Sequence, residues 1–454
     1  MMNAHEPYAR EVTINACKLC NPLGASLVFR GIEGAVPLLH GSQGCATYIR
    51  RYLISHFKEP VDIASSNFSE SSTIFGGGAN LKQALQNVIS QYRPALIGIA
   101  TTCLSETIGD DVRLILDEFK REYGAPGRPV LVTVSTPSYQ GSHIDGFHDA
   151  VQAVIQQVAS GGPKKSMVTI FPGMVSAADL RLLKEILIDF GLDFLMLPDY
   201  SETMDGVIWD TYQIIAPGGA PVSKIRAAGR SKAALQLGRC IRRQQNAAEY
   251  LAERFGVEGY TLGLPVGIKE TDRLMQTLAI LAGRDIPRKY QEERGRLIDA
   301  YVDAHKYLYG KKAAVYGEPD LVLGMASFLA EVGMVPAICA TGSKSGKLAE
   351  ELRKLLPESE EGMTEVAEGV DFEDIRMLIE RVRPDVLIGN SKGYPLARRY
   401  GIPLIRVGFP IHDRIGGPRL LHMGYRGTQQ LFDRIVNALI RARQDQSPIG
   451  WSYI

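Results

Sequence analysis

ALIGIATTCLSET, residues 95–107, has the pattern of a buried strand followed by a polar turn and a helix. Its first six residues are apolar or glycine, a short run that is typical of a strand in a parallel sheet. Thr101 and Thr102 end that run, and Cys103 follows where the next element begins. Ligands of parallel α/β sheets bind beyond the carboxyl ends of the strands, so this stretch predicts both a sheet and a site at its edge.

The same strand–helix format recurs along the whole chain. We expect strands at 95–100, 130–134, 167–171, 194–197, 313–316, 386–389 and 404–407. Amphipathic helical patterns cover 80–92, 110–121, 178–190, 319–332, 372–382 and 428–443. Such alternation predicts right-handed crossovers and sheets covered on both faces. The fold class is therefore α/β, with three Rossmann-like domains expected at 1–162, 163–300 and 301–454.

The composition excludes several classes of function. The chain has 454 residues, with 51 Lys and Arg against 50 Asp and Glu. This neutral balance argues against a nucleic acid or an anionic membrane as the main partner. No apolar run reaches the ~18 residues that a membrane-spanning helix needs. The first twelve residues, MMNAHEPYAREV, lack the basic and apolar regions of a signal peptide, which predicts a cytoplasmic location.

Six cysteines are too few for a disulfide framework in a chain of 454 residues. Four of them lie in the first quarter, which favours metal or redox chemistry there. Cys240 and Cys339 stand alone, and we expect each to pack as a small buried hydrophobe. Cys17 and Cys20 have CxxC spacing, but no second CxxC accompanies them, so a zinc knuckle or a thioredoxin-type site has little support.

Glycine, proline and small polar residues surround the remaining cysteines. The relevant stretches are CNPLG at 20–24, HGSQGC at 40–45, TTCLSET at 101–107 and TPSY at 136–139. Thiolates are the soft ligands of iron–sulfur clusters, and glycine lets the backbone approach a cluster closely. The glycines at 76–78 lack the Walker pattern, so we do not expect this chain to hydrolyse ATP.

Several longer motifs together resemble β-type subunits of the nitrogenase component 1 family. They are HGSQGC at 40–45, SHFKEP at 55–60, FGGG-x-N-x-K at 75–82, TTCLSET-x-GDD at 101–111, TPSY-x-GSH-x-x-GF at 136–147, YGEPDLVLG at 316–324, LIGNSKG at 387–393 and RVGFPIHDR at 406–414. The resemblance covers essentially the whole chain. It implies three Rossmann-like domains, an α-type partner in an α2β2 heterotetramer, and an ATP-hydrolysing iron protein as electron donor.

The resemblance also implies a cofactor and its ligands. Cys20, Cys45 and Cys103 match the β-side thiolates of an [8Fe-7S] P-type cluster that is shared with the α subunit. Ser138 matches a serine that ligates this cluster when it is oxidised. An interfacial half-site also agrees with the residues themselves, because three thiolates are too few to close such a cluster.

Two aromatic residues match positions on the route of the electrons. Tyr48 matches a tyrosine between the two large clusters, although a simple core tyrosine is an equal alternative. Phe75 matches the docking face for the iron protein, and its place before three glycines predicts an exposed turn. An ordinary loop anchor is the alternative for Phe75. No catalytic residue is expected in this chain, because the catalytic cofactor belongs to the α subunit.

Two functions remain open from the sequence. The complete set of Cys20, Cys45, Cys103 and Ser138 favours the β subunit of a reductase, acting on dinitrogen or cleaving the C–S bond of methylthio-alkanes. Residues 424–433 and 447–454 instead resemble the β-like subunit of the scaffold on which the iron–molybdenum cofactor matures, where a [4Fe-4S] cluster is the alternative. Cys17 has no counterpart in the family's ligand set, and we expect it not to be a ligand.

Overall fold

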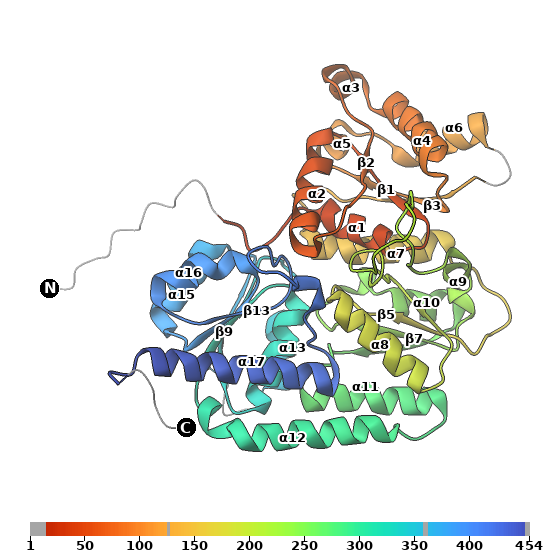
Figure 1. The fold of residues 1–454 in the computed structure, drawn as a ribbon. Coiled ribbons are helices and arrows are strands. Elements are labelled where there is room, and N and C mark those ends of the chain that lie inside the picture. The colour runs from red at the N-terminus through yellow and green to blue at the C-terminus, as the bar shows by residue number, and fades with distance from the viewer. Residues whose placement is uncertain (1–14, 125–127, 357–361, 450–454) are drawn as a thin grey trace.

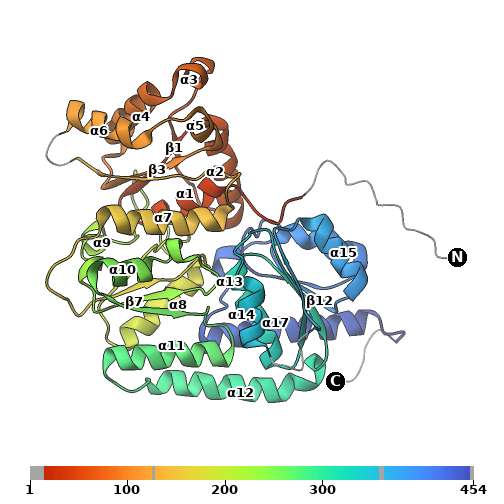
Figure 2. The ribbon, with the colours of Figure 1, turned by 180° about the vertical axis from the view of Figure 1, so that it is seen from behind.

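The computed structural model describes residues 15–124, 128–356 and 362–449, which form three β-sheets (Figure 1, Figure 2). The strand orders are β2-β1-β3-β4, β6-β5-β7-β8 and β11-β10-β9-β12-β13. Every strand pair in these sheets is parallel, which confirms the predicted α/β class. The first twelve residues and the last five lie outside the described residues. The expectations about targeting and about the C-terminal tail rest partly on these residues.

The first sheet carries all the motifs around Cys45 and Cys103. Its strands are β1 (Ala35–His40), β2 (Ala64–Ser65), β3 (Leu96–Thr101) and β4 (Val130–Val134). Its helices are α1 (Asn21–Arg30), α2 (Gln43–Phe57), α3 (Glu70–Phe75), α4 (Gly78–Tyr92), α5 (Cys103–Ile108), α6 (Val112–Tyr123) and α7 (His143–Val158). All side chains of β1 and β3 are buried, as expected for central strands with helices on both faces.

The second sheet follows directly. Its strands are β5 (Val168–Phe171), β6 (Phe194–Met196), β7 (Ala233–Leu237) and β8 (Glu258–Leu262). Its helices are α8 (Ala177–Asp189), α9 (Val222–Arg226), α10 (Ala247–Phe255) and α11 (Gly267–Ala282), and α12 (Arg288–Leu308) leads on to the third sheet. Short 3₁₀ turns lie at Ala228–Arg230, Arg243–Gln245, Ser391–Gly393 and Gly417–Arg419.

The third sheet completes the fold. Its strands are β9 (Lys312–Tyr316), β10 (Val335–Thr341), β11 (Glu365–Glu368), β12 (Val386–Gly389) and β13 (Leu404–Arg406). Its helices are α13 (Pro319–Glu331), α14 (Leu348–Leu355), α15 (Phe372–Val382), α16 (Tyr394–Tyr400) and α17 (Gly424–Asp445). Each of the seven predicted strands is present with its ends within one residue of those expected.

The last described helix, α17, lies alongside α12, and its start meets the beginning of α11 (Figure 1). Its first residue, Gly424, donates its N–H to Pro265 O at 2.8 Å. One turn later, Thr428 Oγ1 accepts the N–H of Gly267 at 2.9 Å. The C-terminal helix therefore closes the side of the molecule that α11 and α12 form.

The expected domain boundaries stay predictions. The strands of the three sheets fall in the ranges 35–134, 168–262 and 312–406, while the boundary expected at residue 300 lies inside α12. No helix among the described residues is both long and apolar enough to cross a lipid bilayer.

Close contact between α1 and α7 holds the first cysteine segment against the first sheet. A Cβ atom added to Gly24 on α1 would lie 1.8 Å from His143 O and 2.6 Å from Phe147 N, both backbone atoms of α7. Backbone atoms cannot move aside as the end of a flexible side chain can. The two helices can therefore approach this closely only with glycine at position 24.

We predict that Gly24→Ala lowers the free energy of unfolding by about 3 kcal/mol or more, since the new methyl group overlaps backbone atoms. Gly295→Ala is the matched control, because it lies inside α12 and a Cβ added there would meet no described atom within 4 Å apart from the backbone of its own helix. The control should stabilise the protein by up to about 1 kcal/mol through helix propensity alone. Denaturant midpoints of the two variants measure the contrast, and equal midpoints would contradict the packing argument.

Candidate functional site

Cys45 lies in the first turn of α2, just past the carboxyl end of β1. The turn between them is Gly41–Ser42, and Ser42 is the N-cap of α2, where its hydroxyl accepts the N–H of Gly44 at 3.2 Å. This cap fixes where the helix begins. The thiol of Cys45 is therefore presented at the sheet edge where parallel α/β proteins bind their ligands.

Cys103 reaches the same edge from the neighbouring strand. It is the first residue of α5, directly after β3, and Thr102 is the N-cap. The Thr102 N–H and the Ser105 hydroxyl bond at 2.9 Å in a capping box. The Cys103 side chain is exposed, so its thiol is available at the surface.

Cys20 and Ser138 complete the set of predicted ligands. Cys20 is the N-cap of α1 and is partly exposed. The next residue, Asn21, donates its N–H to Ser138 Oγ at 3.1 Å, while the Ser138 N–H lies 3.2 Å from Cys103 Sγ. Ser138 thus connects the start of α1 with the Cys103 thiol, and the structure brings all four predicted ligands to one place.

The other two thiols lie close enough to Cys45 to affect its ionisation. Partial burial raises the pKa of Cys45, and the nearby Cys20 and Cys103 raise it further. Tyr48, one turn after Cys45 on α2, also contacts Cys20, and burial with this neighbour raises the pKa of its hydroxyl. The ring of Tyr48 lies 4.9 Å from that of Tyr52. Tyr48 is 37 % exposed, so it lies beside the thiols rather than in the core.

The spacing of these donors fits a cluster better than a single metal ion. Within the described ranges, no three His, Cys, Asp or Glu side chains are close enough to share one ion. Thiolates from three separate segments can instead ligate different irons of one larger group. The Ser138 N–H directed at Cys103 Sγ is the kind of hydrogen bond that ligating sulfurs accept. The residues present therefore fit an iron–sulfur cluster.

Cys17 belongs to different surroundings from Cys20. It packs with Tyr316 and Phe372 in the core around the third sheet, and a Cβ on Gly342 would lie 2.3 Å from Cys17 O. Burial raises the pKa of Cys17 to about 12. The structure therefore gives Cys17 a packing role, and the CxxC spacing does not bring the two thiols to one site. Cys240 and Cys339 are buried, as predicted, and all six cysteines are free.

Phe75 is the most exposed large aromatic in the described part of the chain. It is the last residue of α3 and is 86 % exposed, and Ile74 beside it is 74 % exposed. Gly76 ends the helix with φ of +94°, a conformation that favours glycine. The predicted exposed turn is present, and the docking role of Phe75 stays a prediction.

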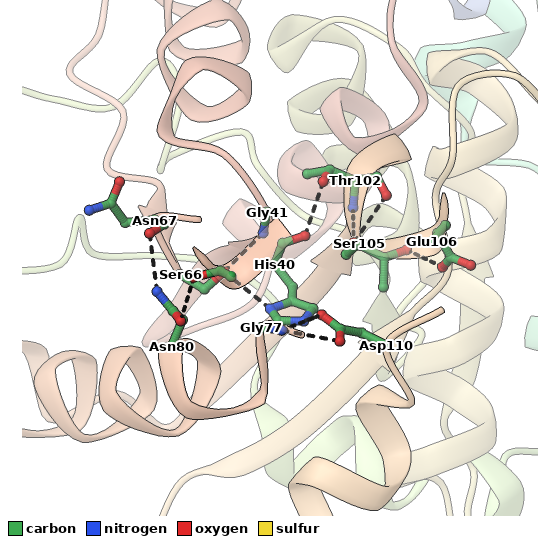
Figure 3. A network of polar contacts seen from close by, with 12 residues as sticks. His40, Gly41, Ser66, Asn67, Gly77, Asn80, Thr102, Ser105, Glu106 and Asp110 are labelled. Atoms are coloured by element: carbon green, nitrogen blue, oxygen red, sulfur yellow. Dashed lines mark hydrogen bonds and ion pairs between the residues drawn. The ribbon is translucent and has the colours of Figure 1, made fainter. Parts of the chain in front are cut away.

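Sequence reasoning gave no role to His40 and Asp110, which the structure brings together. His40 Nε2 lies 3.0 Å from Asp110 Oδ2, and both groups are almost fully buried (Figure 3). The residues lie within the quoted motifs but 70 positions apart. Their polar character at strand and helix ends was the only signal that the sequence offered.

Comparison with known proteins agrees with the fold and the motifs. The family model for nitrogenase component 1 type oxidoreductases matches residues 20–440. The nitrogenase molybdenum-iron protein beta chain of Clostridium pasteurianum is 36% identical over 433 residues, covering 95% of this chain and 94% of the relative. That of Methanothermobacter thermautotrophicus is 35% identical over 442 residues, covering 95% of each.

A solved structure is similar over nearly the whole length. The structure called "Nitrogenase Cp1 at pH 6.5" superposes with a TM-score of 0.93 and 34% sequence identity, covering 99% of this chain and 98% of that one. A second chain, from "Nitrogenase Cp1 at pH 5", has a TM-score of 0.69 at 18% identity and shares the fold alone.

Thiol accessibility gives a direct test of this geometry. In the folded chain treated with a chelator, we predict that Cys103 reacts first with iodoacetamide because it is exposed. Burial raises the pKa of Cys17 and that of Cys339 to about 12, so these thiols are rarely ionised at neutral pH. They should react at least ~10-fold more slowly, as expected for buried thiols. Mass spectrometry of the labelled peptides measures the rates, and labelling in denaturant supplies the control. Equal rates for Cys17 and Cys103 in the folded chain would contradict this assignment.

Proposed function

Because the chain belongs to the nitrogenase component 1 family as a β-type subunit, we propose that it serves in an ATP-dependent nitrogenase-like reductase. In this role it holds half of an interfacial [8Fe-7S] P-type cluster. The reaction proposed for the complete enzyme is dinitrogen reduction, after the names of its relatives, or reductive C–S cleavage of methylthio-alkanes. The choice of substrate depends on the cofactor of the α subunit.

The observation that carries this proposal is the meeting of Cys20, Cys45 and Cys103 at one sheet edge. Each thiol comes from a different segment, and the pKa of Cys45 responds to the other two. Ser138 is adjacent, with its N–H on Cys103 Sγ. When bound, the cluster would supply one-electron transfer between the iron protein and the cofactor of the α subunit. The three thiolates would hold it, and Ser138 would offer a fourth donor on this side.

An α-type partner follows from the incompleteness of this site. The thiol of Cys103 and the ring of Tyr139 are exposed, the latter at 62 %. Tyr139 directly follows Ser138, whose N–H contacts Cys103 Sγ. Exposed aromatic side chains are typical of protein interfaces. We propose that an α subunit supplies the remaining cluster ligands, within an α2β2 heterotetramer.

An assembly scaffold is the second candidate function. Residues 424–433 favour it by their resemblance to scaffold subunits. In that case the interface would hold a [4Fe-4S] cluster, for which Cys45 is essential and Cys20 and Cys103 are partly dispensable. The retention of all three thiols at one place favours the reductase.

Iron content of single variants tests both candidates. In the complex co-expressed with its α-type partner, we expect Cys17→Ser to retain the iron of the wild type, since Cys17 lies in the core around the third sheet. Cys20→Ser, Cys45→Ser and Cys103→Ser should each lose most of the interfacial iron, because each removes a thiolate. Iron quantification with EPR measures this. Full iron in the Cys20 and Cys103 variants would favour the scaffold, and iron loss in Cys17→Ser would show that it is a ligand.

Phe75 is proposed to anchor the iron protein. Truncating a central aromatic anchor typically weakens an interface by about 2 kcal/mol, so we expect Phe75→Ala to raise the half-saturating concentration of iron protein about 30-fold. Iron content should be unchanged. Ile280→Ala is the control, because Ile280 is an apolar residue 72 % exposed on the distant helix α11. Turnover measured across iron-protein concentrations distinguishes the two variants, and an unaltered profile for Phe75→Ala would count against docking there.

A further inference from the structure

The ring of His40 is held from both sides at the end of β1. Its Nδ1 lies 3.1 Å from Ser66 Oγ and its Nε2 3.0 Å from Asp110 Oδ2 (Figure 3). Ser66 Oγ already accepts the N–H of Gly41 at 2.9 Å, so its proton can be directed at Nδ1. The neutral ring with a proton on Nε2 then satisfies every partner, a tautomer assigned from the network. His40 is completely buried.

Asp110 connects this ring to the turn that follows Phe75. The N–H of Gly77 lies 3.1 Å and 3.0 Å from the two oxygens of Asp110. A Cβ on Gly77 would lie 2.2 Å from the ring of Phe68, which in turn packs edge-on against His40 at 4.9 Å. The turn at Gly77 therefore packs against Phe68 and donates a hydrogen bond to Asp110.

A second route joins the helices on either side of the Gly76–Gly77 turn to the ring of His40. It consists of two hydrogen bonds and one step along the chain. Ser72, on the helix that ends at Phe75, donates its hydroxyl to Asn80 Oδ1 at 2.8 Å. Asn80 Nδ2 then donates to Asn67 O at 3.2 Å. Asn67 follows Ser66, the hydroxyl partner of His40. Both routes meet at His40 (Figure 3).

The backbone of His40 faces the thiol-bearing turns. Its carbonyl accepts both the N–H and the hydroxyl of Thr102 at 3.1 Å, and Thr102 caps the helix that begins with Cys103. A Cβ on Gly41 would lie 2.0 Å from Thr102 Oγ1, so the turn that leads to Cys45 is packed directly on this cap. The side chain of His40 thus reaches the exposed turn through Asp110, and its backbone contacts the turn that leads to Cys103 directly.

From these contacts we infer that His40 and Asp110 are a positioning pair, which couples docking of the iron protein at Phe75 to the placement of the Cys45 and Cys103 thiolates. The inference rests on the proposed function. A closely packed, fully bonded network transmits a displacement because its members cannot relax independently. A network that only supported the fold would not respond to docking. The test must therefore measure how far docking at Phe75 changes the surroundings of Cys45 and Cys103.

Asp110→Asn cuts the coupling with little change of shape. An amide nitrogen must replace one of the two carboxylate oxygens, and it is itself a donor. At the position of Oδ1 it would face the Gly77 N–H at 3.1 Å, and at the position of Oδ2 it would face both Gly77 N–H and His40 Nε2–H at 3.0 Å. Asp179→Asn is the matched control, because Asp179 is also a buried carboxylate paired with a histidine. It lies on α8, 3.2 Å from Nδ1 of His422, and accepts the backbone N–H of His422 at 2.8 Å. Both variants lose part of a buried Asp–His pair, but only one lies between Phe75 and the thiols.

Hydrogen exchange of the holo-complex, with and without the nucleotide-bound iron protein, supplies the readout. In the wild type and in Asp179→Asn, docking should slow exchange at residues 70–80 and also at 40–46 and 102–108. In Asp110→Asn the protection at 70–80 should persist, while the response at 40–46 and 102–108 falls at least about fivefold, the lower end of typical coupling. An undiminished response there in Asp110→Asn would overturn the inference.

Rapid reduction kinetics give an independent measure. Electron delivery by the iron protein should slow about tenfold in Asp110→Asn, whereas reduction of the cluster by a small chelated metal reductant, which needs no docking, should be unchanged. Equal slowing of both would mark a supporting role and overturn the inference. If Asp110→Asn fails to assemble, His40→Gln, which removes the other member of the pair, replaces it with the same expected outcome. Absence of protection at 70–80 in the wild type would instead remove the proposed docking role, and the inference with it.

Discussion

The parallel pairing of β1 with β3 is the constraint from which the site follows. His40 pairs with Thr101, so the two strands end at the same level, and β4 ends beside them. The turns that leave these strands carry Cys45, Cys103 and Ser138 and therefore emerge at one edge. A slip of one residue would turn every side chain to the opposite face of the sheet. Local caps refine the position of each thiol, but the register of three strands brings the thiols together.

Much of the fold could be predicted because most strands are continuous apolar runs flanked by turn residues. The pattern does not predict β1, since Pro37 lies in the middle of this central strand and proline there argues against a strand. Pro336 has the same effect in β10, and the sequence AALQL of β7 has weak strand propensity. Burial compensates in each case: Pro37 lies opposite Gly98, and all of β1 is in the core.

The sequence predicts those parts of the site in which the residue type itself indicates the chemistry. It does not predict those parts in which residues act together only because the fold brings them into contact. Cys20, Cys45 and Cys103 stand out as thiols beside glycine and small polar residues, and the structure brings them together. His40 and Asp110 meet only because α5 and β1 end side by side, which no local pattern encodes. Cys17 shows the converse, since its sequence spacing to Cys20 predicts proximity at one site but its side chain is buried against the third sheet.

The position of α17 has a consequence for biosynthesis. Residues near its start bond to the second unit, where Gly424 meets Pro265 and the backbone of His422 bonds to Asp179. A ribosome synthesises α17 well after α11 and α12, so the side formed by these two helices stays open until residues 424–445 have been made. Contacts that join distant parts of a chain form late and leave apolar surface exposed meanwhile. Nascent chains that lack α17 should therefore recruit chaperones through α11 and α12.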